Sequence, residues 1–471
     1  MCGNSMGAII KRELLDHLQS IQFLVLTAAS LVLFAGNAIV FVRSFPEETA
    51  AFSRRVTETD RQSSTVATEL NKRPNALRFI ADGGDRYRSS GYTLRPGGRL
   101  EPLPVGQINY KMPDVPELDW SFLIAVVFSL YVILLGFNAI SGEKELGTLR
   151  LVLSNRVSRV ELLAAKFIAI LLVAMVPLLM GGLVSLTIIG IYQPQVLNMA
   201  NFSRMAVVLP LALFFLAVFA LLSLCISSLV SRSSVVLLLI LAIWVILAVI
   251  VPNTSGILAE RFSRAQSEFQ MARMVGPLIQ KQVFDRIKAI LARAEKGEFP
   301  SAAEMKQEGD EAYDEGQKDL VRHYENYEAA MKQRAGLARA LARLSPTGLF
   351  QFALEDIVRA GNSREEDFVR DARNYSQQYD GYILKKVGRL VRTSNFSFAV
   401  STYIKGQMVL LNSPQPQEYA GDKSDFPRFQ ESQPSLMQGV QNAMWDMVGL
   451  LLWVMIIAVL AFMSFLRTDV R

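Results

Sequence analysis

Long apolar runs alternate with polar stretches along this chain of 471 residues. Residues 120–142 and 167–203 carry no charged side chain. A helix of about 20 apolar residues crosses the hydrocarbon core of a bilayer, so runs of this length predict membrane spans. Six spans are predicted, at 21–43, 120–140, 162–192, 205–230, 235–251 and 447–466. The expected fold class is therefore a membrane protein, mainly α.

A shorter amphipathic pattern precedes the first span. Its apolar side chains recur on one helical face, at Met6, Ile10, Leu14 and Leu18. The charged Lys11, Arg12 and Glu13 lie elsewhere around the turn. This pattern is typical of a helix that lies in the membrane interface, and it predicts an interfacial helix over residues 1–20. The alternative is that these residues simply begin the first span.

The first polar insert covers residues 44–119. Its pattern predicts a helix to about Leu70, and after that the pattern is no longer helical. Residues 92–99 predict a strand that enters a type II turn, with Pro96 and Gly97 at its centre. Residues 105–111 give a weak strand signal. We therefore expect a small α+β external piece.

The second insert, residues 253–440, is larger and helical in pattern. Apolar stripes predict two long helices, at 258–294 and 303–344, which a short break would join into a hairpin. Ser345-Pro346 should end the second helix, because proline disfavours a helical residue before it. Shorter elements should follow to about Leu411, and residues 412–434 read as loop. Residues 441–471 would then hold the sixth span and the C-terminus.

A charged stretch, Ser141–Lys166, joins the second and third spans within residues 120–252; we call residues 141–161 the polar link. It is too short to leave the bilayer surface, so the chain must turn there. Leu146, Leu149 and Leu153 fall at helical spacing and predict one apolar stripe. Ser158 with Glu161 reads as a capping box, so a new helix should begin near Arg159. The link is either a solvated turn or a docking element.

Composition and charge exclude several classes of function. The formal charge of +6 is spread along the chain, so a nucleic-acid partner is not expected. Two cysteines and two distant histidines offer no disulfide framework and no metal site. The chain has no P-loop, no catalytic constellation and no cofactor motif. Charges are almost absent from the spans, which disfavours an ion-coupled transporter.

The polar link resembles a segment of the membrane subunits of type 2 ABC exporters. The resemblance rests on Gly142-Glu143-Lys144-Glu145-x-Gly147-Thr148-Leu149 at the end of a span, followed by Arg-Val-Ser-Arg. The Lys-Arg-Glu-Leu-Leu start and the Phe-Leu-Arg-x-Asp-Val-Arg end are also similar, whereas the two large inserts depart from the minimal family pattern. The resemblance implies that the following residues lie at an ATPase contact: Gly142, Glu143, Lys144, Glu145, Gly147, Thr148 and Arg150.

The resemblance further implies a bacterial cytoplasmic (inner) membrane protein that binds no cofactor itself, with ATP and Mg²⁺ on a separate ATPase subunit. A second, identical or related permease subunit and membrane lipid are the other expected partners. Basic residues gather near the polar link and both chain ends, which places these in the cytoplasm and the inserts outside. An amphipathic cargo would suit the uncharged spans. The alternative is a mechanotransmission subunit that drives an envelope partner through its external helices; a sensor or scaffold is the third reading.

Overall fold

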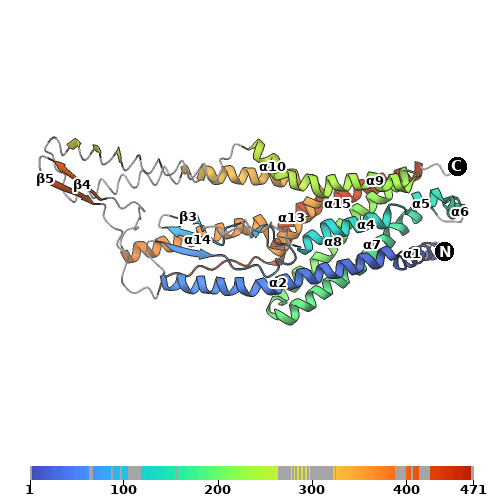
Figure 1. The fold of residues 1–471 in the computed structure, drawn as a ribbon, viewed down its shortest axis with the longest axis horizontal. Helices are drawn as coiled ribbons and strands as arrows, with labels where there is room; N and C mark the ends of the chain where they lie inside the picture. Colours follow the sequence, from blue (N-terminus) through green and yellow to red (C-terminus); the bar gives the residue numbers. More distant parts are fainter. Residues whose placement is uncertain are drawn as a thin grey trace.

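The computed structural model is elongated, with both termini at one end (Figure 1). It describes residues 3–62, 67–85, 88–95, 98–103, 118–154, 158–263, 322–323, 325–387, 399–404, 407–412 and 425–467, and single positions between 277 and 296. In this part of the chain, six helices are long and apolar enough to cross a membrane: Ile21–Asp60, Trp120–Glu145, Arg159–Tyr192, Met199–Leu229, Ser233–Phe262 and Leu436–Arg467. The prediction of six spans in a mainly α fold is confirmed.

Helix α1 (Gly3–Leu18) is separated from α2 (Ile21–Gln62) by a short break at Ser20. The Ser20 hydroxyl accepts a 3.1 Å hydrogen bond from the Phe23 amide and so caps the new helix. Helix α2 then continues through Pro46 without interruption, so the expected boundary at residue 43 falls inside one helix. The prediction of helix to about Leu70 is wrong in its last part, because Leu70 lies on a strand.

That strand belongs to a three-stranded antiparallel sheet, in the order β1 (Thr68–Asn71), β2 (Gly91–Arg95) and β3 (Arg99–Pro102). Leu70 lies opposite Tyr92, and Leu94 lies opposite Leu100. The predicted strand before the turn is confirmed. The turn centre at Pro96 and Gly97 and the weak strand signal at 105–111 lie outside the described residues.

The sheet packs against α14 (Gly361–Val387), so the two inserts join into one body (Figure 1). Their shared buried core consists of Leu70, Leu94, Phe368, Ala372, Tyr375, Tyr379, Tyr382 and Ile383. Buried Lys72 forms an ion pair with Glu365, and Arg364 pairs with Asp85 at 2.7 Å. Gly83 has φ +61°, and a Cβ there would lie 2.3 Å from the Gly361 amide. We call β1–β3, α14 and residues 425–435 the distal module.

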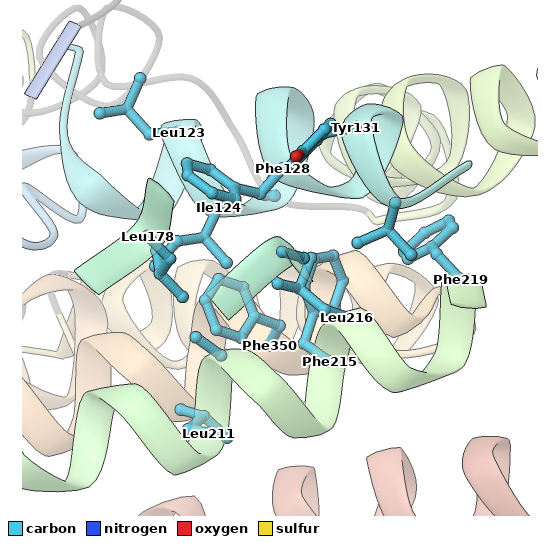
Figure 2. Close-up of a cluster of buried hydrophobic side chains, with 14 of the residues drawn as sticks. Leu123, Ile124, Phe128, Tyr131, Leu178, Leu211, Phe215, Leu216, Phe219 and Phe350 are labelled. Carbon is cyan, nitrogen blue, oxygen red and sulfur yellow. The ribbon is translucent and has the colours of Figure 1, made fainter. Parts of the chain in front are cut away.

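The second span consists of α3 (Trp120–Phe122), η2 (Leu123–Phe128) and α4 (Ser129–Gly136). The third span is α7 (Arg159–Tyr192) and the fourth is α8 (Met199–Leu229), and the short helix η3 (Pro194–Val196) lies between them. Large apolar side chains of these helices meet in a tight buried cluster (Figure 2). Pro177 lies inside an uninterrupted α7. A proline in a span is tolerated where neighbouring helices cover the freed carbonyl.

The fifth span is α9 (Ser233–Trp244), η4 (Val245–Ile250) and α10 (Val251–Phe262). The expected end of this span at residue 251 is wrong, because the helix continues through Pro252 to Phe262. Proline has no N–H, so a carbonyl one turn earlier loses its donor. The π-helical η4 precedes it, and there the Leu247 carbonyl accepts a hydrogen bond from the Ser345 hydroxyl instead. A distant side chain thus stabilises the continuation.

The second insert does not lie wholly beyond the spans. A helix over 325–342 ends before Ser345-Pro346, as predicted, and α13 (Pro346–Val358) starts there. Helix α13 packs between α8 and the last span, α15 (Leu436–Arg467), and the rings of Phe350 and Phe215 stack at 4.5 Å. Figure 2 shows Phe350 among the side chains of the spans.

The rest of that insert differs from the sequence prediction in detail. Helices α13 and α14 have 13 and 27 residues, so they are shorter than the two predicted long helices, as expected. Strands β4 (Ala399–Ile404) and β5 (Gln407–Asn412) form an antiparallel pair. Most of the predicted hairpin over 258–344 lies outside the described residues. Helix α15 begins at Leu436, earlier than the expected start of the last span.

A buried ionic cluster joins the 325–342 helix to α13 and α15. Asp446 is fully buried and accepts hydrogen bonds from Arg343 at 2.5 and 3.0 Å. Arg339 donates to Asp356 at 2.9 Å and lies 3.7 Å from Asp446. The cluster therefore anchors the 325–342 helix to the beginning of the last span.

Beside this cluster, burial raises the pKa of Glu355 to about 7, against the opposing charges of Arg88 and Arg339. A carboxyl with a raised folded-state pKa stabilises the fold below its unfolded value of 4.5, and this contribution is lost as pH rises through 7. We expect the melting temperature to fall between pH 5 and 8 and to fall less in E355Q. The difference corresponds to at most about 3 kcal/mol. Equal pH dependence of both proteins would contradict this prediction.

Candidate functional site

The polar link forms two short helices, α5 (Ser141–Glu145) and α6 (Thr148–Ser154), rather than one. Gly147 lies between them with φ +69°, a conformation that suits glycine. The resulting bend separates the expected apolar stripe, because Leu149 is buried whereas Leu146 is 79% exposed. The single stripe is therefore wrong for these two residues, and the Leu153 side chain lies outside the described part.

The predicted capping box is confirmed. The Ser158 hydroxyl accepts from the Glu161 amide at 3.2 Å, and the Glu161 carboxylate accepts from the Ser158 amide at 3.0 Å. Helix α7 accordingly begins at Arg159, whose guanidinium donates to the carbonyls of Phe465 and Leu466 at the end of α15. A cation at the carbonyl end of a helix is favourable. The link is thereby attached to the last span.

Lys166 is the centre of the site. Its side chain is 2% exposed, and its ammonium donates to Glu13 at 2.7 Å and to Glu143 at 2.8 Å. These three residues come from α7, α1 and α5. A buried charge is stable only when paired and hydrogen-bonded, and two carboxylates satisfy this one. The triad fixes the N-terminal helix and the polar link to the third span.

The remaining charges of the link bind the turn between α8 and α9. The Glu145 carboxylate accepts from the Ser233 amide at 2.9 Å and from its hydroxyl at 3.0 Å, so it caps α9. The Lys144 ammonium donates to the Ser228 carbonyl near the end of α8. The Ser227 hydroxyl accepts from the Ser141 amide at 2.9 Å. The link is thus held against three other spans.

The other predicted site residues make fewer contacts or are exposed. Thr148 donates from its hydroxyl to the Glu143 carbonyl at 3.3 Å, and Gly142 has room for a Cβ. Lys11, Arg12 and Arg150 are exposed. Leu151 is 68% exposed and Leu146 is more so, which gives the link two apolar side chains on its surface.

Sequence reasoning missed the partners that hold the link, namely Glu13 with Lys166, and Ser227 and Ser233. Lys166 did carry a signal, because it stands among apolar residues within the first turns of a span. Ser227 and Ser233 carried no such signal, because their partners in the link are about 86 to 88 residues away in the sequence.

The site consists of a polar turn whose charged side chains are held by the ends of neighbouring spans. No group of three His, Cys, Asp or Glu side chains that could hold a metal occurs in the described part of the chain. This polar turn and the six long apolar helices together define a multi-pass membrane protein. Residues 7–470 match the model of a family described as ABC-2 family transporter protein, and the chain belongs to that family. No curated protein matches the chain.

Proposed function

We propose that this chain is the transmembrane subunit of an ATP-driven exporter and that its polar link receives a separate ATPase subunit. Membership of the ABC-2 family supports the ATPase partner. ATP and Mg²⁺ would be bound by that partner, and a second permease subunit would complete the pathway. The polar link and both termini would face the cytoplasm of a bacterium, and the distal module would lie outside the inner membrane. An amphipathic cargo fits the uncharged spans.

The Glu13–Lys166–Glu143 triad is the observation that carries this proposal. It holds α1, the polar link and α7 together at one end of the spans. A displacement of the link by a docked partner would therefore act directly on a span. Glu145 and Lys144 extend the same contact to α8 and α9.

The ATPase contact is best tested at Leu146. The charged side chains of Glu143, Lys144 and Glu145 are engaged within the chain, so reversing the charge of Glu143 would also break its pair with Lys166. Leu146 is 79% exposed, and replacing it disturbs little internal packing. We expect L146D to weaken co-purification of the ATPase by about tenfold, because a charge would enter an apolar contact.

The matched control is L384D. Leu384 is 49% exposed and lies on α14 in the distal module, far from the polar link. Its substitution should leave the complex intact. Equal recovery of the ATPase with L146D and with the wild-type chain, at equal membrane insertion, would remove Leu146 from the proposed contact.

A mechanotransmission role is the second candidate, and one observation favours it. The 325–342 helix is attached to α15 by the Arg343–Asp446 pair, and α13 is packed among the spans. Movement of the spans would therefore be transmitted to the distal helices. ATPase activity in liposomes separates the candidates: stimulation by amphipathic compounds favours export, whereas stimulation only by an envelope partner favours mechanotransmission.

A further inference from the structure

A cavity of about 350 Å³ lies where the distal module meets the ends of two spans. Its wall is formed by four segments, within residues 73–77, 198–204, 358–364 and 431–436. The second segment begins α8 and the last one leads into α15. The cavity is thus at the end of the spans opposite to the polar link (Figure 1).

Positive charge dominates the lining. Four arginines face this space, Arg73, Arg204, Arg359 and Arg364, and Glu431 is the one carboxylate among the lining residues. We call this cavity the arginine pocket. Guanidinium groups bind phosphate and carboxylate oxygens through paired hydrogen bonds, so a cluster of them is suited to an oxyanion.

Two of the arginines are held rigidly. Arg204 is 6% exposed and donates to the carbonyls of Ile357 and Pro434, both at 2.6 Å. Neutral carbonyls fix its direction without cancelling its charge. Arg364 is also buried, and it pairs with Asp85 at 2.7 Å and with Glu431 at 3.3 Å. Both guanidiniums are therefore positioned before any ligand arrives, which lowers the entropic cost of binding.

Arg359 is the third arginine of the lining whose contacts are described. It ends α13 with φ +60°, where an arginine costs about 1 kcal/mol relative to glycine. Its guanidinium donates to the Ser432 carbonyl at 2.7 Å, while its buried Nε has no hydrogen-bond partner among the described residues. Burial and the charges of Arg364 and Arg204 together lower the pKa of Arg359 to about 10, against the raising effect of the Glu431 and Asp371 carboxylates.

We propose that the arginine pocket binds the phosphate group of a ligand, either a phospholipid headgroup or a soluble phosphate compound. An anion would pair with the clustered guanidiniums that line the cavity. The volume is at the lower end of the range for small-molecule sites and suits a headgroup. The position beside the ends of α8 and α15 gives a membrane lipid access. The proposal does not depend on ATPase docking at the other end of the spans.

The test is calorimetric titration of the full chain, purified in detergent, with dihexanoyl phosphatidic acid, inorganic phosphate and dihexanoylglycerol. We expect saturable binding of a phosphate-bearing probe and none of dihexanoylglycerol, which lacks phosphate. Binding of phosphatidic acid alone identifies a lipid source. Binding of inorganic phosphate with similar affinity identifies a soluble source.

Three variants decide whether the pocket is responsible. R359Q and R73Q should each weaken binding by about tenfold, because each removes a charged hydrogen-bond donor. Arg73 is exposed, so R73Q keeps the test valid even if R359Q folds poorly. R54Q removes an exposed arginine of α2 that does not line the pocket, and it should change nothing. The proposal is overturned if no phosphate-bearing probe binds, or if R73Q and a folded R359Q bind like R54Q.

Discussion

Replacing Asp446 with alanine should lower the free energy of unfolding by about 3 kcal/mol, the largest loss of stability that we expect from one substitution. Asp446 has no solvent exposure and pairs with Arg343 through two hydrogen bonds, with Arg339 nearby. Its removal would leave the Arg343 guanidinium without its buried partner, whereas Arg339 would keep Asp356. Thermal unfolding would show the loss, and amide hydrogen exchange should accelerate in the 325–342 helix and in the first turns of α15.

The chain offers a matched exposed pair as control. Arg334, on the same helix, pairs with Glu260 at 2.9 Å, but Glu260 is 67% exposed. E260A should therefore cost no more than about 1 kcal/mol. An apolar double substitution, R343M with D446L, should recover much of the loss, because it removes both partners of this pair and leaves neither one buried alone. A D446A protein as stable as E260A would show that the ionic cluster does not hold the helix.

Replacing Lys166 with methionine should detach α1 from the polar link and reduce coupled ATPase activity at least about tenfold. The ammonium of Lys166 lies within 2.8 Å of two carboxylates, and its removal leaves Glu13 and Glu143 facing each other. Two like charges this close repel in a partly buried site. Faster tryptic cleavage at Lys11 and Arg12 would report the detachment, and activity of the reconstituted complex would report the coupling.

Two further variants separate charge from packing at this position. K11M removes an exposed lysine of α1, and it should keep wild-type activity and wild-type cleavage at Arg12. E13Q and E143Q combined with K166M remove all three charges, and this triple variant should regain part of the attachment because its carboxylates no longer repel. If K166M keeps full activity and normal cleavage, the triad has no part in coupling.

Local signals explain what the sequence could predict. The spans follow from uncharged runs of membrane length, and the start of α7 follows from Ser158 and Glu161, which are three residues apart. The end of the 325–342 helix follows from Ser345-Pro346. Each of these signals is contained in a short window, so one sequence is sufficient to read it.

The errors came from contacts between distant residues. Pro252 stays within a helix because η4 precedes it and the hydroxyl of Ser345, more than 90 residues later, reaches the Leu247 carbonyl. Helix α13 packs among the spans, where the ring of Phe350 stacks on the ring of Phe215. The pairing of Lys166 with Glu13 crosses 153 residues. No periodicity or spacing in the chain carries such pairings.

Helix α2 gives the molecule a lever arm. It runs unbroken for 42 residues from its start beside α1 at one end of the spans to the distal module, a length of about 60 Å. A tilt of about 5° around its first turn would displace the far end by about 5 Å, roughly one helical turn. Pro46 removes one backbone hydrogen bond near the middle, which makes that point the easiest place for the arm to bend.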